Sequence, residues 1–199
     1  MPPKLILASG SPYRLELLQQ AGIEADAVPS HVPEPDLHTF PDLAAGLIYL
    51  AQSKANAVAP LHPGRPILAA DTVSLVDGHI LGKPTDRNDA ERMLRKMSGV
   101  HHEVWTGWTL LAADRSFTVT GVDKTSILFR TWTESDLNDY LDCGEWQGKC
   151  GAYGLRWPND PMVESLHGSV SNVIGLPLEQ IQSTLNRIPA LFELHEPSP

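Results

Sequence analysis

A strand-like run, Leu5-Ile6-Leu7-Ala8, is followed by the small residues Ser9-Gly10-Ser11-Pro12 and then by the helix-like run Tyr13-Arg14-Leu15-Glu16-Leu17-Leu18. A loop of small residues at a helix N-terminus directs backbone N–H groups and the positive end of the helix dipole toward one point, which favours an anion. Pro12 suits the first helical turn, where its missing N–H costs little. Arg14 can offer a forked guanidinium to a phosphate. An ordinary serine-capped surface helix with a solvated arginine also fits these residues.

Length and charge narrow the function classes. The chain has 199 residues and a formal net charge of −9. This length supports one substantial α/β core or two small lobes. Lysine and arginine are scattered, so the electrostatic footprint of a duplex-binding protein is missing, although a few focused cations suffice for a small anionic substrate. No apolar run approaches the roughly 20 residues that span a bilayer, and no signal-peptide layout opens the chain. We therefore expect a cytoplasmic protein that binds neither nucleic acid nor membrane.

Cysteine and histidine spacing gives no sign of a structural metal. Cys143 and Cys150 lack CxxC spacing, so we expect two reduced, partly buried thiols. The histidines, including the adjacent His101 and His102, lack zinc-site spacing.

Hydrophobic periodicity predicts alternating strands and helices, hence an α/β fold. Ile67–Ala70 is a wholly apolar run, which predicts a doubly covered strand that ends at Asp71. That carboxylate would then lie at a strand's C-terminal end, where open α/β sheets bind ligands. Asp77-Gly78 predicts a hairpin turn. The other expected elements are a short strand within 23–29, helices over 42–58 and 86–97, antiparallel strands over 103–112 and 117–129, helices opening at 133 and 177, and a small-residue loop over 168–173.

Several charged residues fall in the expected loops and at helix edges. Phosphoryl chemistry needs cations to neutralise phosphate oxygens and a carboxylate to hold Mg²⁺ or to deprotonate the attacking water. Asp71 is the carboxylate, Glu34 lies in a proline-rich acidic loop, and the cations are Lys54, Lys83 and Lys149.

Each of these residues also has a purely structural interpretation. Asp71 suits a turn after its strand, and Glu34 suits an exposed loop. Lys54 has the position of a helix-edge lysine, and Lys83 that of a solvated hairpin residue. A P-loop is excluded, because the spacing from Gly78 is wrong and proline replaces the required Ser or Thr. The loop around Ser169 lacks the GxSxG pattern of a serine hydrolase.

Several motifs, in order from about residue 4 to 182, resemble the Maf family. They are Leu5-Ile6-Leu7-Ala8-Ser9-Gly10-Ser11-Pro12-x-Arg14-x-Glu16-Leu17-Leu18, Ala69-Ala70-Asp71-Thr72-Val73, Leu81-Gly82-Lys83-Pro84, Met93-Leu94 through Ser98-Gly99, Thr106-Gly107, Lys149-x-Gly151-Ala152-Tyr153-Gly154 and Ser171-Asn172-Val173-Ile174-Gly175-Leu176-Pro177.

This resemblance implies a nucleoside triphosphate pyrophosphatase that uses Mg²⁺ or Mn²⁺ and releases a nucleoside monophosphate and pyrophosphate. The implied fold is similar to that of inosine triphosphate pyrophosphatases, with a long mixed sheet and two lobes around a central cleft. It would form one domain over 1–199, usually as a homodimer, with a frayed tail after about residue 195.

The resemblance also implies roles for individual residues. Asp71 would accept the proton of the attacking water and touch the metal, which Glu34 would help to hold. Lys54 and Lys83 would be catalytic residues that also contact the substrate. Ser9, Arg14 and Lys149 would contact the substrate.

Three segments depart from the family pattern. Tyr13 replaces the first of two arginines, and Gly148 replaces an acidic residue before the lysine. Arg156-Trp157 stands where the branch preferring thymidine and uridine triphosphates carries Gln-Gly. An amide donates and accepts hydrogen bonds whereas arginine only donates, so base preference does not transfer, and Arg156 becomes a candidate substrate contact.

A second function class is a nucleotide-binding regulator of cell division that has lost turnover. The changes at Tyr13 and Gly148 favour it. Retention of Asp71, Lys54 and Lys83 favours the hydrolase, because a binder has little need of a water-activating carboxylate.

Overall fold

The structure is a computed structural model that describes residues 4–156 and 158–193. Trp157 and the expected frayed tail after about residue 195 lie outside the described residues.

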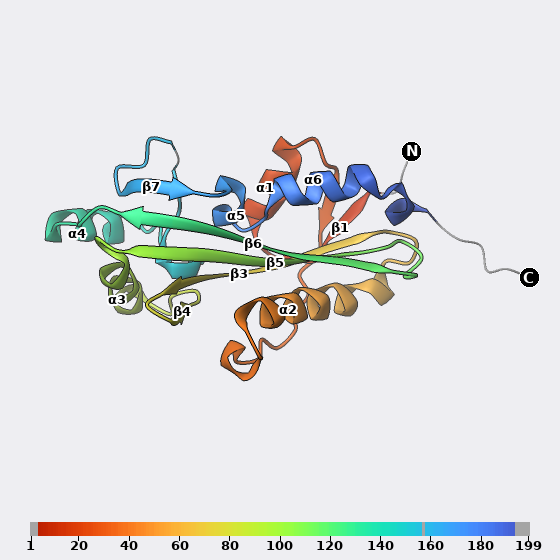
Figure 1. The fold of residues 1–199 in the computed structure, drawn as a ribbon, viewed down its shortest axis with the longest axis horizontal. Helices are drawn as coiled ribbons and strands as arrows, with labels where there is room; N and C mark the ends of the chain where they lie inside the picture. Colours follow the sequence, from red (N-terminus) through yellow and green to blue (C-terminus); the bar gives the residue numbers. More distant parts are fainter. Residues whose placement is uncertain (1–3, 157, 194–199) are drawn as a thin grey trace, which may run out of the picture. The chain divides into compact units, whose positions relative to one another are not determined.

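Seven strands form one mixed sheet in the order β2-β1-β3-β5-β6-β7, with β4 paired to β3 (Figure 1). Strand β1 runs parallel to both β2 and β3, whereas the β3–β4 and β6–β7 pairs are antiparallel. The expected α/β class is therefore confirmed. The strands are β1 (Leu5–Leu7), β2 (Ala25–Ala27), β3 (Ile67–Val76), β4 (His79–Leu81), β5 (His101–Leu111), β6 (Thr118–Phe129) and β7 (Val163–His167).

Three of the helices begin at residues that provide capping side chains. Asp42, Asp86 and Thr133 each accept a hydrogen bond from the backbone N–H three residues later. The α-helices are α1 (Pro12–Gln20), α2 (Leu43–Val58), α3 (Arg87–Met97), α4 (Glu134–Asp142), α5 (Val170–Ile174) and α6 (Leu178–Arg187). Short 3-10 turns are η1 (Leu37–Thr39), η2 (Ala59–Leu61), η3 (Cys150–Ala152) and η4 (Pro189–Phe192).

The chain divides into two compact units, which we describe separately. The first unit comprises residues 1–71, 106–123 and 175–199, and the second comprises 72–105 and 124–174. In the first unit, the apolar face of α2 packs on β1 and β3, with Ala55 and Val58 against Ile6, Ile67 and Ala69. Gly107 of β5 permits this packing, because a Cβ there would lie 2.6 Å from the carbonyl carbon of Leu47.

The interior of the second unit is rich in aromatic rings. Phe129 lies 4.5 Å, centroid to centroid, from both His102 and Tyr153. Tyr153 in turn stacks on Tyr140 at 5.5 Å. His102 is only 3% exposed, and its burial lowers its pKa to about 4. The imidazole is therefore a neutral core side chain at neutral pH.

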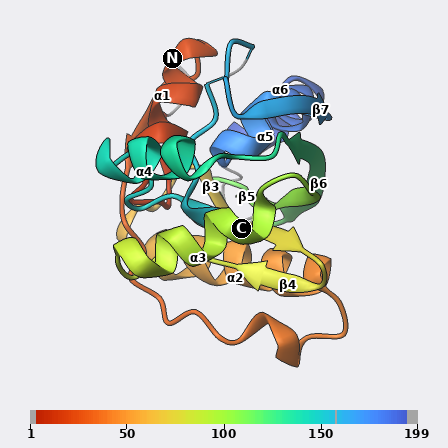
Figure 2. The same ribbon diagram turned by 90° about the vertical axis from the view of Figure 1, so that its left-hand side faces the viewer.

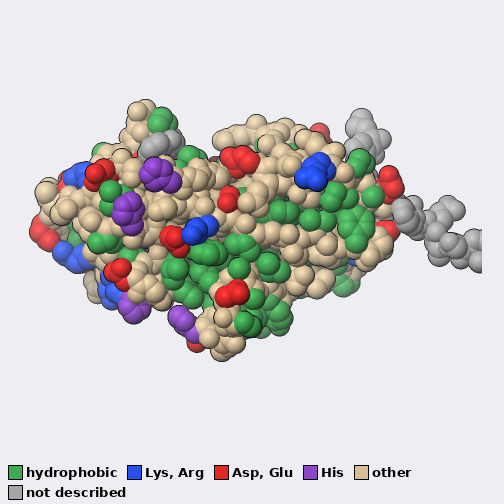
Figure 3. Space-filling model, in the orientation of Figure 1, with side chains coloured by type: hydrophobic (Ala, Val, Ile, Leu, Met, Phe, Trp, Pro, Cys, Tyr) green, Lys and Arg blue, Asp and Glu red, His purple; other side chains and the backbone are tan. Residues whose placement is uncertain are grey.

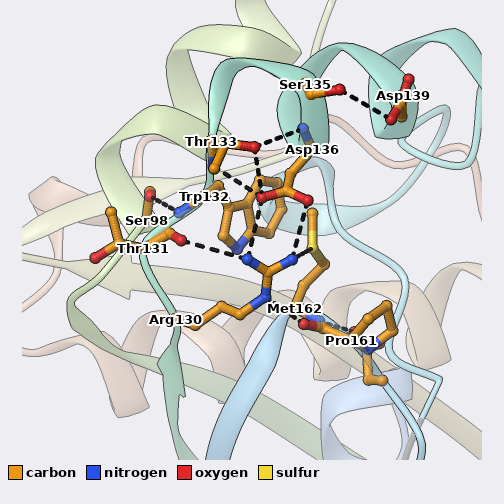
Figure 4. A network of polar contacts seen from close by, with 11 residues as sticks. Ser98, Arg130, Thr131, Trp132, Thr133, Ser135, Asp136, Asp139, Pro161 and Met162 are labelled. Carbon is orange, nitrogen blue, oxygen red and sulfur yellow. Dashed lines mark hydrogen bonds and ion pairs between the residues drawn. The ribbon is translucent and has the colours of Figure 1, made fainter.

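A polar network anchors α4 in the second unit (Figure 4). The Arg130 guanidinium donates two hydrogen bonds of 3.0 Å to the Asp136 carboxylate. That carboxylate also accepts from the backbone N–H and the hydroxyl of Thr133, each at 2.8 Å, which completes a capping box. Arg130, followed by the Thr133 donors, holds the pKa of Asp136 well below its usual range.

The structure corrects four expectations from the sequence. Strand β3 does not end at Asp71 but continues through it to Val76, because Asp71 is paired with Lys54 within the first unit. Within the expected loop over 168–173, the last four residues belong to helix α5. Strand β7 was not expected. Cys143 is exposed instead of partly buried, although neither cysteine forms a disulfide, as expected.

Candidate active site

The opening loop is held in place by Arg14. The backbone N–H of Ala8 donates to Leu68 O at 2.7 Å, so β1 stops near the start of β3. Arg14 then donates to three oxygens: Nε to Gly175 O at 2.7 Å, and Nη1 to Ala70 O at 2.8 Å and Ser9 Oγ at 3.2 Å. Arg14, which we expected to contact a phosphate, thus connects three distant segments of the first unit, one of which lies next to Asp71.

Ser9 is a buried hydroxyl at the end of β1. Its Oγ accepts from the Ser11 backbone N–H and from Arg14, both at 3.2 Å. A hydroxyl that accepts two hydrogen bonds retains one proton to donate. Pro12 occupies the first turn of α1 as expected.

Two carboxylates converge on one ammonium in the first unit. Lys54, from α2, bonds the Asp71 carboxylate of β3 directly and lies 2.8 Å from Glu34 Oε1. The side chains of Lys54 and Asp71 are each 11% exposed, whereas Glu34 is 61% exposed. The burial of an ion pair is costly unless its partners are well placed, so this cluster is a candidate for a functional site.

The segment that carries Glu34 is packed on α2. In Figures 1 and 2 the chain between β2 and α2 passes along the outer side of α2. Gly46 of α2 allows this contact, because a Cβ there would lie 2.8 Å from Leu37 and 3.1 Å from Phe40. The proline-rich loop is therefore tied to the helix that carries Lys54.

Asp71 lies within strand β3 and not at its end, but its position beside the end of β1 still suits ligand binding. Its neighbour β1 has ended by this level, and the loop after β1 begins beside Ala70. The carboxylate therefore borders the carboxyl end of a parallel strand, where α/β sheets leave room for ligands.

In the second unit, a backbone hydrogen bond links the segments that carry Lys83 and Lys149. Gly151 N donates to Gly82 O at 2.9 Å. Gly151 has a φ of +65°, and a Cβ there would lie 2.6 Å from Ser74 Oγ. Lys83 itself is exposed where the chain leaves the β3–β4 hairpin.

Lys149 and Arg156 share one acidic partner that the sequence analysis missed. Lys149 Nζ lies 2.6 Å from Glu145 O and 3.3 Å from Glu145 Oε2. Arg156 Nη2 lies 3.5 Å from Glu145 Oε1. Glu145 thus supplies the acid that is absent at Gly148. The four-residue spacing between Glu145 and Lys149 was the available signal, but ion-pair spacing applies to helices and this segment is not one.

Surface charge, helix hydrophobicity and the grouping of possible metal ligands bear on the expected partners. On the face drawn in Figure 3, basic side chains stand apart from one another among acidic ones. Within 4–156 and 158–193, no helix is both long and apolar enough to cross a membrane. The same described residues contain no group of three or more His, Cys, Asp or Glu side chains arranged to hold a metal ion.

Known proteins resemble this chain along most of its length. A dTTP/UTP pyrophosphatase of Geobacter sp. strain M21 is 41% identical over 94% of this chain and 96% of its own. Proteins of the same name from Citrifermentans bemidjiense and Geobacter sulfurreducens are 41% and 40% identical, again over 94% of this chain and over 96% and 98% of theirs.

Two solved structures show weaker similarity. The Staphylococcus aureus Ham1 protein has a TM-score of 0.42 and 12% identity, covering 63% of this chain and 71% of that one. A nucleoside-triphosphatase described as a dITP/XTP pyrophosphatase, from Mycobacterium abscessus, has a TM-score of 0.41 and 18% identity, covering 94% of this chain and 96% of that one. The family model of the Maf-like proteins matches residues 4–188, and the chain therefore belongs to the Maf family.

Proposed function

We propose that this protein hydrolyses nucleoside triphosphates to the nucleoside monophosphate and pyrophosphate. The observation that carries the proposal is the buried Lys54–Asp71 ion pair with the exposed Glu34 beside it, which occurs in a chain whose relatives are named dTTP/UTP pyrophosphatases. Water attacks the α-phosphorus, and the bond from that phosphorus to the oxygen bridging to the β-phosphorus breaks. The electron pair of the broken bond leaves with pyrophosphate.

Asp71 is the general base in this proposal. Its carboxylate accepts a proton from the attacking water, and the Lys54 ammonium beside it balances charge on the phosphate oxygens. The hydrogen bond from the Arg14 side chain to the backbone carbonyl of Ala70 fixes the strand position next to this carboxylate. Ser9 donates its remaining hydroxyl proton to a phosphate oxygen.

A divalent cation, Mg²⁺ or Mn²⁺, belongs to the same proposal. Glu34 and Asp71 fit it, because both carboxylates already converge on one positive group, the Lys54 ammonium. Mg²⁺ at phosphate sites commonly uses one or two protein carboxylates, together with substrate oxygens and water. When bound, such an ion supplies charge neutralisation at the phosphoryl oxygens.

The cations of the second unit are assigned to substrate binding. Lys83 and Lys149 would contact the triphosphate, and Arg156 would contact the substrate near the base. Lys149 and Arg156 share Glu145, so a change at this acid alters both. We also propose a cytoplasmic homodimer, and sedimentation analysis should give the mass of two chains.

The test is a pyrophosphate-release screen with Mg²⁺ and with Mn²⁺. dTTP and UTP come first, because the relatives are named for them, followed by the other normal, methylated and damaged triphosphates. We expect one pyrophosphate for each monophosphate and loss of release in EDTA. Nucleotide binding without release from any substrate would contradict the hydrolase and favour the regulator.

A further inference from the structure

The ammonium of Lys54 lies where two carboxylates converge. It contacts Asp71 Oδ1 directly and Glu34 Oε1 at 2.8 Å. An ammonium is a compact positive charge with three N–H donors and no acceptor. Two of these donors satisfy oxygens that the proposed function assigns to a divalent cation. The lysine is therefore an internal substitute for that cation.

Lys54 and a divalent cation would compete for the same oxygens. Lys54 and Asp71 are each 11% exposed, so bulk water screens the repulsion between two cations there only weakly. The base of the lysine cannot move away easily. Its neighbour Ala55 is 1% exposed in the core, and α2 rests on Gly107 of β5 with no space between them. The flexible four-carbon stem is the part of Lys54 that can move.

We propose that the Lys54 ammonium holds the place of the divalent cation until a triphosphate draws it away, so that metal loading is coupled to nucleotide binding. This inference rests on the proposed function of the site. Triphosphate oxygens offer the ammonium new acceptors, and its departure releases lone pairs on Glu34 and Asp71. The protein alone therefore binds the cation weakly, which keeps the site unloaded without substrate.

The test measures Mn²⁺ binding to protein without nucleotide, by the loss of the electron paramagnetic resonance signal of free Mn²⁺. Lys54→Gln removes the charge but keeps N–H donors for both carboxylates. We expect its dissociation constant for Mn²⁺ to fall by about tenfold or more, within the range of typical coupling between sites. Lys54→Met should show the same gain, and it provides a second neutral variant if one of the two fails to fold.

Two further variants localise the effect. Lys54→Arg keeps the positive charge, so its Mn²⁺ affinity should remain at the wild-type level. Adding Glu34→Gln to Lys54→Gln removes one carboxylate and should abolish the gain. Thermal unfolding checks that each variant is folded.

The inference is overturned if a folded neutral variant binds Mn²⁺ no more tightly than wild type, or if the gain survives Glu34→Gln. The assay contains no nucleotide and reads no turnover, so it fails independently of the proposed function. Pyrophosphate release without a gain in Mn²⁺ affinity rejects the inference alone. A gain in Mn²⁺ affinity without release from any substrate rejects the hydrolase alone.

Discussion

Lys54 and Asp71 of the first unit are in direct contact, and each side chain is 11% exposed. In the second unit two of the three candidate cations are more accessible: Lys83 is exposed and the Arg156 side chain is 58% exposed, whereas the Lys149 side chain is 14% exposed. The interior of that unit instead holds aromatic rings and the neutral imidazole of His102. The first unit buries both members of an ion pair, whereas Lys149 and Arg156 of the second unit pair with Glu145, whose side chain is 42% exposed.

This difference assigns different tasks to the two units. Surroundings that exclude water strengthen electrostatic effects on a reacting group. Burying an ion pair costs desolvation free energy, so we expect one where its charge contributes to function. We therefore assign proton transfer to the first unit. We assign further substrate contacts to Lys83, Lys149 and Arg156 of the second unit, whose core holds aromatic rings. The following four predictions test this division in order of expected effect.

The largest effect is expected for Asp71→Asn. The amide keeps the size of the side chain but cannot take a proton from water, so turnover should fall by about 10² to 10⁴ while nucleotide still binds. Pyrophosphate release and calorimetric nucleotide binding measure the two effects. Asp136→Asn makes the same chemical change in the α4 cap of the second unit and should leave turnover intact. Full activity in Asp71→Asn would remove this carboxylate from the reaction.

Acid should destabilise the protein through His102. Burial lowers its pKa to about 4 in the folded state, whereas the unfolded value is about 6.5. The unfolded state thus binds the proton first, so its stability contribution is complete above pH 6.5 and is lost as the pH falls toward 4. The loss should reach roughly 3 kcal/mol.

Urea unfolding at stepped pH measures this loss as the difference between wild type and His102→Leu. The variant should lack the part of the slope between pH 6.5 and 4. His101→Gln, at an exposed neighbouring position, serves as the control and should keep it. Equal slopes in wild type and His102→Leu would show that the buried imidazole does not carry the pH dependence.

Lys83→Met should weaken substrate binding more than catalysis. Loss of a charged contact to phosphate costs about 1.5 kcal/mol, so the KM should rise about tenfold with a smaller change in kcat. Steady-state kinetics separates the two constants. The control is Lys96→Met on the exposed face of α3, which should leave both constants unchanged. A large fall in kcat at constant KM would move Lys83 into the reaction itself.

The smallest effect is expected in the α4 cap. Thr133→Ala removes the hydroxyl that accepts from Asp136 N, which should lower the free energy of unfolding by about 1 kcal/mol. Turnover should not change. Ser135→Ala, two residues later at an exposed position of α4, should cost less. Denaturant unfolding of both variants measures this difference, and a loss of activity in Thr133→Ala would contradict the division of tasks.

Local features were predictable from the sequence because their physics acts within a few residues. The Asp77-Gly78 turn joins β3 to β4 as expected, with φ values of 48° and 74°. The buried face of α3, Ala90, Met93, Leu94 and Met97, follows directly from its periodicity.

Features that depend on distant partners were not predictable in the same way. The rule that an apolar strand ends at a charge failed at Asp71, because the partner that neutralises it, Lys54, comes from a helix 17 residues earlier. Arg14 was expected to face a phosphate, and nothing in its neighbourhood predicted bonds to carbonyl oxygens 56 and 161 residues away. The roles of the site residues remain predictions that came from the family resemblance.

The contact between Gly107 and Leu47 has a consequence for how this protein can evolve. Leu47 and Lys54 lie on the same helix, seven residues and thus about 10 Å apart. A single methyl group added at Gly107 would push against α2 and shift the part of that helix that carries the Lys54 ammonium. Side-chain volume at this one sheet position therefore affects where the Lys54 ammonium lies, two helical turns away.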